Sequence, residues 1–530
     1  MAITVTPNLT LISDADTAAA QGTWLGNSGG PDTEAKVQGA GSYTWTVAKN
    51  SRGPVTFTPT SPINMNATGT HIYFWMQCSV FPFANPKRTG TTLTSGLTVR
   101  LTNGANFREW HVAGNDTWGG EWKCFVIDLQ NTDQIYASNG TMDWTSIDVI
   151  TWYVDISNSG NIRIIDNVWN DVCYFGTGLT LTGDDFDLKD AAAVDESGSF
   201  RYGVLENIDN VVFCQGKLTI GSAATKTYMN SDNEVLVYRS RVGAGKGGVV
   251  SKDLYQFVVT GSNCTMSLAS NVFKSANATL PFKFNASAAS LAIGAVTMSG
   301  GTVVNAGTSS FKGYELIQNS AFTGCGQINA GESVFRANTI SNTLHPSGAL
   351  LFNTGSTTNN MSDLIFVASG TLSHAIHITT AATYSLNNFT YTGYGADGTD
   401  TAVVYNASNG PVLLEVLGGD VPTYLNSGSS TTAISSPATL TLTGLVAGTE
   451  VTIVSGSPPT EFFHLENVTE TGIATYPYTD AAGKVVDILI FHVDYDPNLS
   501  SQLNYTLLTD NATIPIKQIA DRNYRSGSGG

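Results

Sequence analysis

The sequence predicts an all-β protein with an N-terminal jelly roll, a central parallel β-helix and a C-terminal immunoglobulin-like or transthyretin-like β-sandwich. All nine tryptophans precede residue 170, which marks a change from a bulky aromatic core to a different architecture. Charged residues make up 13% of the 530 residues and hydrophobic residues 42%. Low charge with enough apolar surface for real cores excludes a disordered chain and favours β structure with Thr, Ser and Asn surfaces.

Residues 1–182 are expected to form the jelly roll. The segments 71–78, 97–101, 122–129 and 149–156 are rich in β-branched and aromatic residues, and 97–101 alternates between apolar and polar positions. Segment 71–78 is too apolar for an exposed edge strand. Evenly spaced short strands with few helix signals favour two packed sheets.

A short helix is expected directly after the jelly roll. Asp184, Asp185 and Asp187 precede the segment 188–194, and carboxylates suit the positive N-terminus of a helix, which would cap one end of the β-helix. Together with Asp190 they could also bind calcium. The spacing and glycine of an EF-hand loop are absent, so capping is the simpler interpretation.

The rest of residues 183–417 is expected to form a parallel β-helix. Asn beside a bulky apolar residue recurs at Asn271, Asn319, Asn338 and Asn387, with gaps of 48, 19 and 49 residues. These gaps fit one or two coils of about 20–25 residues each. Small residues suit tight coils, and Asn tolerates the left-handed backbone of turns and can stack in ladders.

The C-terminal part is expected to be a linker followed by a sandwich. Residues 418–436 are rich in Gly and Ser, which is typical of a linker. Residues 437–530 show strict alternation in 438–444 and further strand patterns in 451–454 and 485–491, before a Gly/Ser tail. About 90 residues of strands and turns is the size of one sandwich.

Charge, cysteine usage and hydropathy disfavour several classes of protein. With 25 basic and 42 acidic residues the net charge is −17, so binding to nucleic acid or to an anionic membrane is not expected. The N-terminus lacks the basic and apolar regions of a signal peptide, and no apolar run is long enough for a membrane span. The six cysteines form no CxxC pair and are expected to be buried free thiols.

The order of modules resembles bacteriophage virion appendage proteins of the tailspike, tail fibre and head fibre or decoration type. The run 511–516 with 521–524 is similar to the ending of phage structural proteins, and segment 162–174 resembles the closing strands of carbohydrate-binding jelly rolls. The resemblance implies a homo-oligomer, with a trimer favoured, and partners among capsid or tail proteins. An extracellular type of β composition without an export signal is typical of virion proteins, which are made in the host cytoplasm.

Trp110, Trp118 and Trp122 form the candidate binding group. They surround a Gly-rich loop with acidic residues at 115–121, and such tryptophans could stack on a sugar ring of a host surface glycan. The alternative is that they belong to the jelly-roll core, which is the more common place for tryptophan.

No catalytic, cofactor-binding or metal-binding residue is assigned. Glycoside cleavage needs two carboxylates either ~5–5.5 Å or ~6.5–9.5 Å apart. Residues 254–396 hold only Glu315, Glu332 and Asp363, of which the first two could sit on neighbouring coils. His374 and His377 lie in a strand-like segment, where positions i and i+3 face opposite sides, so a chelating pair is not expected.

Three functions stay open. The first is a non-enzymatic phage structural protein, a virion appendage or capsid-decorating protein that mediates attachment or stabilises the particle. The second is a tailspike-type glycan-binding polysaccharide depolymerase, which an assay on host capsule would separate from the first. The third is a bacterial surface adhesin, which the missing export signal disfavours.

Overall fold

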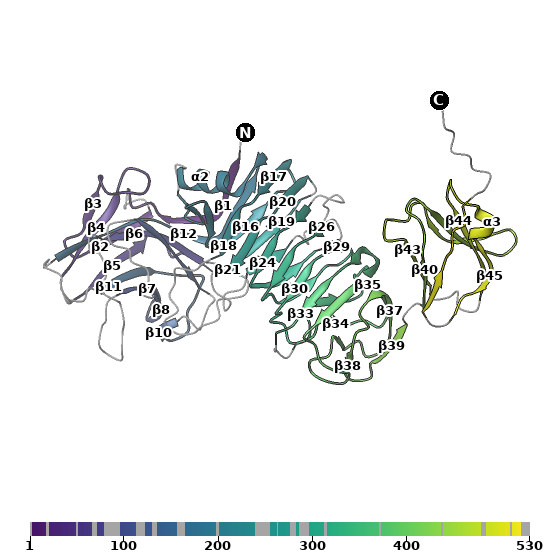
Figure 1. Ribbon diagram of the computed structural model, residues 1–530. Helices are drawn as coiled ribbons and strands as arrows, with labels where there is room; N and C mark the ends of the chain where they lie inside the picture. Colours follow the sequence, from purple (N-terminus) through teal and green to yellow (C-terminus); the bar gives the residue numbers. More distant parts are fainter. Residues whose placement is uncertain are drawn as a thin grey trace, which may run out of the picture.

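The computed structural model describes most of the chain as three bodies in a row (Figure 1). The described residues are 3–16, 21–48, 51–65, 71–78, 96–112, 122–129, 135–155, 165–197, 201–238, 255–261, 263–275, 282–285, 296–311, 315–369, 373–435, 438–478, 484–508 and 511–520. Strands dominate in them, and the all-β class is confirmed. The helical elements are α2 (Leu188–Ser197), η2 (Thr358–Asn360) and α3 (Pro497–Ser500).

The N-terminal body is a sandwich of two antiparallel sheets. One sheet has the order β10 (Ile135–Asn139), β8 (Asn106–Val112), β7 (Gly96–Asn103), β11 (Val149–Asp155), β5 (Arg52–Pro59) and β2 (Gly22–Gly26). The other contains β3 (Gly30–Asp32), β4 (Ser42–Ala48), β12 (Ile165–Thr182), β1 (Thr4–Ser13), β6 (His71–Cys78) and β9 (Lys123–Asp128). A core that includes the fully buried Trp45, Trp110 and Trp152 lies between them.

The central body is a solenoid whose coils contribute strands to three sheets. The first solenoid sheet contains β16 (Lys217–Ile220), β19 (Gln256–Val259), β22 (Phe282–Asn285), β25 (Ala306–Ser310), β28 (Gln327–Asn329), β31 (Leu350–Phe352), β34 (Ile376–Ile378), β36 (Val404–Asn406) and β38 (Tyr424–Asn426). The second contains β13 (Asp184–Phe186), β17 (Thr227–Asp232), β20 (Cys264–Ala269), β23 (Val296–Ser299), β26 (Glu315–Gln318), β29 (Val334–Arg336), β32 (Met361–Ser362), β35 (Thr383–Thr392), β37 (Pro411–Gly419) and β39 (Thr431–Ser435). The third contains β14 (Leu205–Ile208), β15 (Val211–Cys214), β18 (Val235–Tyr238), β21 (Val272–Ser275), β24 (Thr302–Val304), β27 (Ala321–Thr323), β30 (Thr339–Ser341) and β33 (Ile365–Val367), and β35 bends into it.

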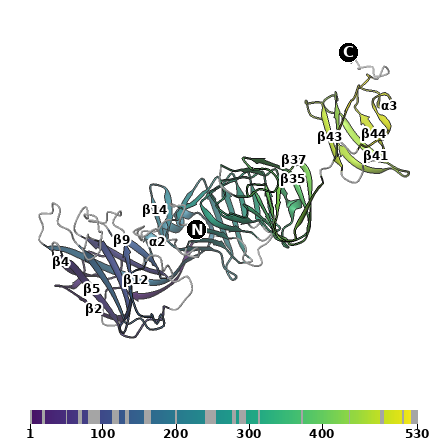
Figure 2. The same ribbon diagram turned by 90° about the horizontal axis from the view of Figure 1, so that it is seen from below.

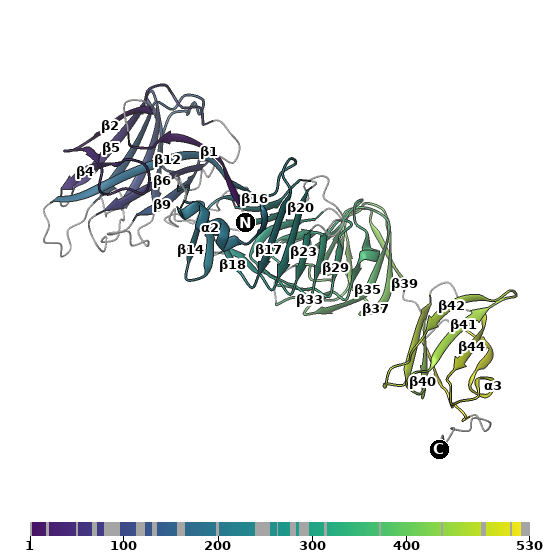
Figure 3. The ribbon, with the colours of Figure 1, turned by 90° about the horizontal axis from the view of Figure 1, so that it is seen from above.

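Coil length in the solenoid varies, which explains why the sequence shows no strict repeat. In the third sheet Ala321 pairs with Thr339, 18 residues on, and Thr339 pairs with Ile365, 26 residues on. The pairing is parallel from coil to coil, and one continuous apolar core fills the interior. Figures 2 and 3 show the coils stacked along the long direction of this body.

Three of the four recurring Asn residues, Asn271, Asn319 and Asn338, occupy a two-residue bend between the second and third sheets, and the fourth, Asn387, pairs with Ser362 just before the bend. The first bend residue has a left-handed backbone, as at Asn319 (φ 50°) and Asn388 (φ 55°), where Asn is better tolerated than most residues. The second bend residue points into the core, as at Asn271 and Asn338, which are fully buried. Asn therefore recurs at one corner for two different physical reasons, and this blurs the sequence period.

Strand β12 joins the N-terminal sandwich to the solenoid. Its first half pairs with β4 and β6 of the sandwich, and its second half pairs in parallel with β16, the first strand of the first solenoid sheet. On β6 the side chains of Phe74 and Met76 enter the sandwich core, while Tyr73 and Trp75 enter the solenoid core. Burial on both faces is the reason why this strand is apolar throughout.

The C-terminal body is a smaller sandwich with its own core. One sheet has the order β43 (Ile473–Tyr478), β40 (Ala438–Thr443) and β46 (Ala512–Pro515). The other has the order β42 (Thr460–Leu465), β41 (Glu450–Ser455), β44 (Val485–Phe491) and β45 (Gln502–Thr506). Leu440, Ile453 and Ile488 are fully buried between them.

The expected linker over 418–436 is wrong. Residues 418–435 form the last coil of the solenoid, in which Tyr424 pairs with Val404 and Thr431 pairs with Pro411. Polar side chains of this coil stabilise its tight turns by hydrogen bonds to the main chain. For example, the Asn409 backbone N–H donates to Ser430 Oγ (2.9 Å). The same residue types that suit a linker also suit a short coil that is held by main-chain pairing.

Candidate functional site

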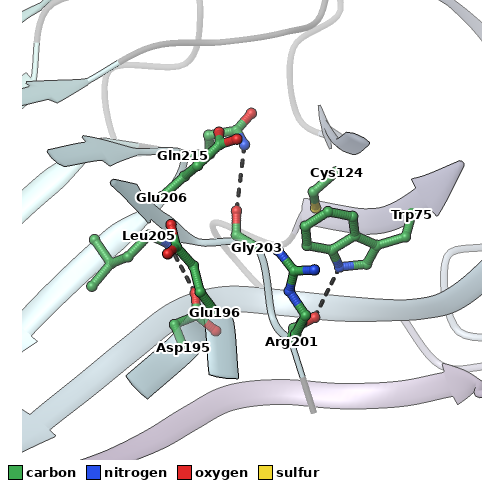
Figure 4. Close-up of a pocket in the computed structure, with 9 residues that line it drawn as sticks. All are labelled: Trp75, Cys124, Asp195, Glu196, Arg201, Gly203, Leu205, Glu206 and Gln215. Atoms are coloured by element: carbon green, nitrogen blue, oxygen red, sulfur yellow. Dashed lines mark hydrogen bonds between the residues drawn. The ribbon is translucent and has the colours of Figure 1, made fainter. Parts of the chain in front are cut away.

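A small hollow lies where the N-terminal sandwich meets the capped end of the solenoid (Figure 4). Its volume is about 10 Å³, and it is lined by Trp75, Cys124, Asp195, Glu196, Arg201, Gly203, Leu205, Glu206 and Gln215. A single water needs at least about 10–15 Å³. The hollow is therefore large enough for about one water and too small for a sugar ring.

Helix α2 covers this end of the solenoid and places Asp195 at the hollow. Its first turn is closed by its own acidic residues, because the Asp190 amide donates to Asp187 Oδ1 (2.7 Å) and the Asp187 amide to Asp190 Oδ2 (3.3 Å). The Leu188 amide donates to Glu234 Oε2 (3.0 Å), a residue of the coil below. Of the four aspartates weighed as calcium ligands, Asp187 and Asp190 thus serve the start of the helix, whereas Asp184 and Asp185 lie in strand β13.

Asp195 holds the chain segment that follows the helix. Its carboxylate accepts hydrogen bonds from the Tyr202 amide (2.9 Å) and from the Leu205 amide (3.0 Å). Burial raises the pKa of Asp195 to about 7, against the backbone hydrogen bonds and the nearby charge of Arg201, which lower it. A fully buried carboxyl that is satisfied by backbone N–H groups serves to position the chain, and it faces no open volume for a substrate.

Trp75 fastens the N-terminal sandwich to the same segment. The indole Nε1 donates to the Arg201 carbonyl (2.8 Å), and the Arg201 guanidinium carbon lies 4.9 Å from the ring centre. Gly203 (φ 72°) passes so close that a Cβ atom there would lie 2.6 Å from the Cβ of Cys124. A larger residue at 203 would push the two bodies apart, so this glycine permits the close fit.

The structure does not bring the predicted tryptophan group together as a sugar platform. Trp110 has no exposed surface and packs in the core of the N-terminal sandwich, near Trp144. Trp122 is half-buried and packs against the solenoid core, and Trp118 lies outside the described residues. Trp110 is thus a core residue, as the alternative interpretation holds, because its strand alternates between the two faces of the sheet.

The carboxylates weighed for glycoside cleavage do not face each other. Glu315 begins β26, is buried, and accepts a hydrogen bond from Ser333 Oγ (2.5 Å) on the neighbouring coil. Glu332 precedes Ser333 on that coil and points to solvent. The two residues do lie on neighbouring coils, but one side chain is buried and the other is exposed.

A cluster of imidazole and phenol rings on the solenoid was not found from the sequence. His374 and His377 both stack on Tyr405, at ring-centre distances of 5.1 Å and 5.5 Å, and Gln327 Nε2 lies 3.0 Å from His377 Nδ1. Burial and the neighbouring His345 and His374 lower the pKa of His377 to about 4. The side chain that connects the histidines, Tyr405, lies one coil further on, which only the register reveals.

The expectation that His374 and His377 face opposite sides of one strand is wrong. Strand β34 begins at Ile376, so His374 precedes it and is not bound by strand alternation. Among the residues that the structure describes, no group of three or more His, Cys, Asp or Glu side chains could hold a metal ion. All six cysteines are buried thiols outside any disulfide, as expected. Within the same ranges, no helix has the length and apolarity for a membrane span.

Comparison with known proteins gives no family. No protein-family model and no curated protein matches the chain. Among solved structures it is similar to an exo-β-agarase (10% identity, 32% of this chain, 24% of that chain, TM-score 0.24). It is also similar to a family 11 carbohydrate-binding module of a cellulosomal cellulase of Clostridium thermocellum (9%, 33%, 86%, 0.19) and to the catalytic unit of a GH87 α-1,3-glucanase from Streptomyces thermodiastaticus (12%, 81%, 95%, 0.24).

The chain spans about a quarter of the length of the agarases that it matches. All the TM-scores are low, so similarity to proteins of carbohydrate metabolism does not by itself assign a fold or an activity to this chain.

Proposed function

We propose that this chain is a non-enzymatic structural protein of a bacteriophage particle, either an appendage or a capsid-decorating protein, in which a solenoid holds two sandwich modules apart. The observation that carries the proposal is strand β12, which belongs at once to the N-terminal sandwich and to the first solenoid sheet. A shared strand makes the two bodies one rigid unit, which is what a spacer on a particle surface requires.

The length of the solenoid suits a spacer. Nine steps of strand pairing lead from β12 to β38 in the first solenoid sheet. At ~4.8 Å a step, the solenoid spans about 40 Å. Only 13% of residues are charged, and main-chain hydrogen bonds run from coil to coil, so most of the cohesion of the rod does not depend on ion pairs.

The first experiment is to search for the protein in purified particles by mass spectrometry and to locate it by immunogold labelling. The proposal expects a fixed copy number per particle and labels at one kind of site. Absence from particles that are otherwise complete would contradict it. Light scattering, with an unboiled sample in SDS, tests the expected trimer separately.

A second candidate function is binding of a host surface glycan by the solenoid, with or without cleavage. The observation that favours it is the cluster of His374, His377 and Tyr405, in which His377 and Tyr405 are partly exposed, because exposed aromatic rings can stack on sugar rings. Incubation with host capsule and a reducing-end assay tests cleavage. Glycan arrays with the wild type and Tyr405→Ala test binding, and equal signals from both would remove the cluster as the binding site.

A further inference from the structure

The C-terminal sandwich exposes far more apolar surface than its size predicts. Nine of the sixteen exposed large hydrophobic side chains among the described residues belong to it: Ile473, Val485, Leu489, Phe491, Val493, Leu499, Leu503, Leu508 and Ile519. The two larger bodies share the other seven. Exposed apolar side chains that gather in one patch mark a surface that another segment of protein covers, and Leu489, Phe491 and Leu503 of this set gather in one place.

Part of this surface is hollowed into a groove on the outer face of the four-stranded sheet. The groove has a volume of about 360 Å³ and is lined by Leu489 and Phe491 of β44, Leu503 of β45, Pro497 of α3, and Glu450 and Thr452 of β41. Phe491 is 54% exposed and Leu503 62%. Within the described part of the chain, strand β45 pairs only with β44 and forms one edge of the sheet, so its other side can pair with a further extended segment.

The described chain ends close to this groove. Ala520 pairs with Tyr495, and the Asp496 amide donates to the Ile519 carbonyl (2.9 Å). Pro497, in the groove lining, follows two residues after Tyr495. At ~3.3 Å for each extended residue, the first four residues after Ala520 can span about 13 Å, which is enough to enter the groove.

The chemistry of the next residues complements the groove. Residues 438–520 contain nine acidic residues but only Lys484 and Lys517 as bases. Arg522 and Arg525 are the first arginines in the sequence after Arg336, and Tyr524 lies between them. A tyrosine beside two arginines fits an apolar groove with Glu450 in its lining, because the ring packs on apolar side chains while the guanidinium groups meet carboxylates.

We propose that segment 521–530 binds in the groove of its own sandwich, with Tyr524 against Leu489, Phe491 and Leu503 and an arginine beside Glu450. The segment then covers apolar surface that would otherwise be open to other proteins. The inference is independent of the proposed function, because it concerns only the C-terminal sandwich.

The test uses the full chain ended after Ala520 and a fluorescein-labelled peptide of residues 521–530. Fluorescence anisotropy is expected to show saturable binding to the shortened chain, and binding at least about tenfold weaker to the complete chain, whose groove is already occupied. The variant Leu503→Arg in the shortened chain should remove binding. Val421→Arg, at an equally exposed apolar residue of the solenoid (60%), is the matched control and should bind like the parent.

Hydrogen–deuterium exchange on the chain without substitutions gives a second readout, independent of how the Arg variants fold. Removal of 521–530 should increase exchange in β44, α3 and β45, and leave β40 and β46 unchanged. The proposal is overturned by unchanged exchange, by absence of peptide binding, or by equal binding to the Leu503→Arg variant. A dimer of the complete chain that becomes a monomer on shortening would also overturn it, in favour of exchange of the segment between two copies.

Discussion

The two ends of the solenoid are joined to their neighbours in opposite ways. At the N-terminal end, β12 crosses the boundary, α2 closes the coil, and Trp75 and Tyr73 of the sandwich enter the solenoid core. At the C-terminal end, no strand pairing among the described residues links the solenoid to the last sandwich, and the core of that sandwich shares no residue with the solenoid core.

The difference shows that equal secondary structure does not imply equal coupling. Both ends of the solenoid are next to an antiparallel sandwich. Only at the N-terminal end do main-chain hydrogen bonds and buried side chains join the two bodies. Two bodies that share a core should unfold together, and a body with its own core should unfold by itself.

Trp75→Ala should destabilise both the N-terminal sandwich and the solenoid. The change removes a nearly buried indole, its hydrogen bond to the Arg201 carbonyl and its packing at the junction, at a cost of about 3–5 kcal/mol. Scanning calorimetry should show one shared transition moving down while the transition of the C-terminal sandwich stays in place. If only a transition of the N-terminal sandwich moves to lower temperature and that of the solenoid does not, the junction does not couple these two bodies.

Ile488→Ala is the matched change in the C-terminal sandwich. Its side chain is fully buried between the two sheets, so truncation should cost about 2–5 kcal/mol. In scanning calorimetry only the transition of the C-terminal sandwich should move to lower temperature. If the solenoid transition moves with it, both ends of the solenoid are coupled to their sandwiches, and the difference between the two ends is refuted.

Asp195 should make the junction less stable as the pH rises. Its folded pKa of about 7 lies above the ordinary value near 3.9, so its contribution is complete below about pH 4 and is lost as the pH rises to about 7. Between pH 5 and pH 8 this amounts to about 2–3 kcal/mol. Thermal unfolding of Asp195→Asn should depend less on pH than that of the wild type. Burial also raises the pKa of Asp171 to about 7. This second carboxyl lowers the stability with rising pH in the wild type and in the variant alike.

Asn338→Ala tests the corner of the coils. It removes the acceptor of the Ser320 amide (2.9 Å) and the donor to the Ile317 carbonyl (3.0 Å) inside the core, which should cost about 1–3 kcal/mol. Asn319→Gly, at the exposed left-handed position beside Ser320 on the preceding coil, is the control and should change stability by less than about 1 kcal/mol. Equal effects in urea unfolding would show that the inward position has no special role.

Sequence patterns predicted the all-β class, the helix over 188–194 and the buried free cysteines. The apolar run 71–78 was placed inside a sheet, but its burial on two faces depends on a contact with residues more than a hundred positions away. The coil over 418–436 was missed because Gly, Ser and Asn are common to linkers and to tight turns. The ring cluster at His374 and Tyr405 depends on the register between coils of unequal length, which no local pattern encodes.

The central claim is that the N-terminal sandwich and the solenoid form one rigid unit. Spin-label distance measurements test it directly, since the six native cysteines are buried and leave introduced ones free to react. Labels at Leu25→Cys and Leu344→Cys, both exposed, span the shared strand, and labels at Leu344→Cys and Val485→Cys span the other end. A single narrow distance distribution is predicted for the first pair and a broader one for the second. A broad or multiple distribution for the first pair would contradict the account.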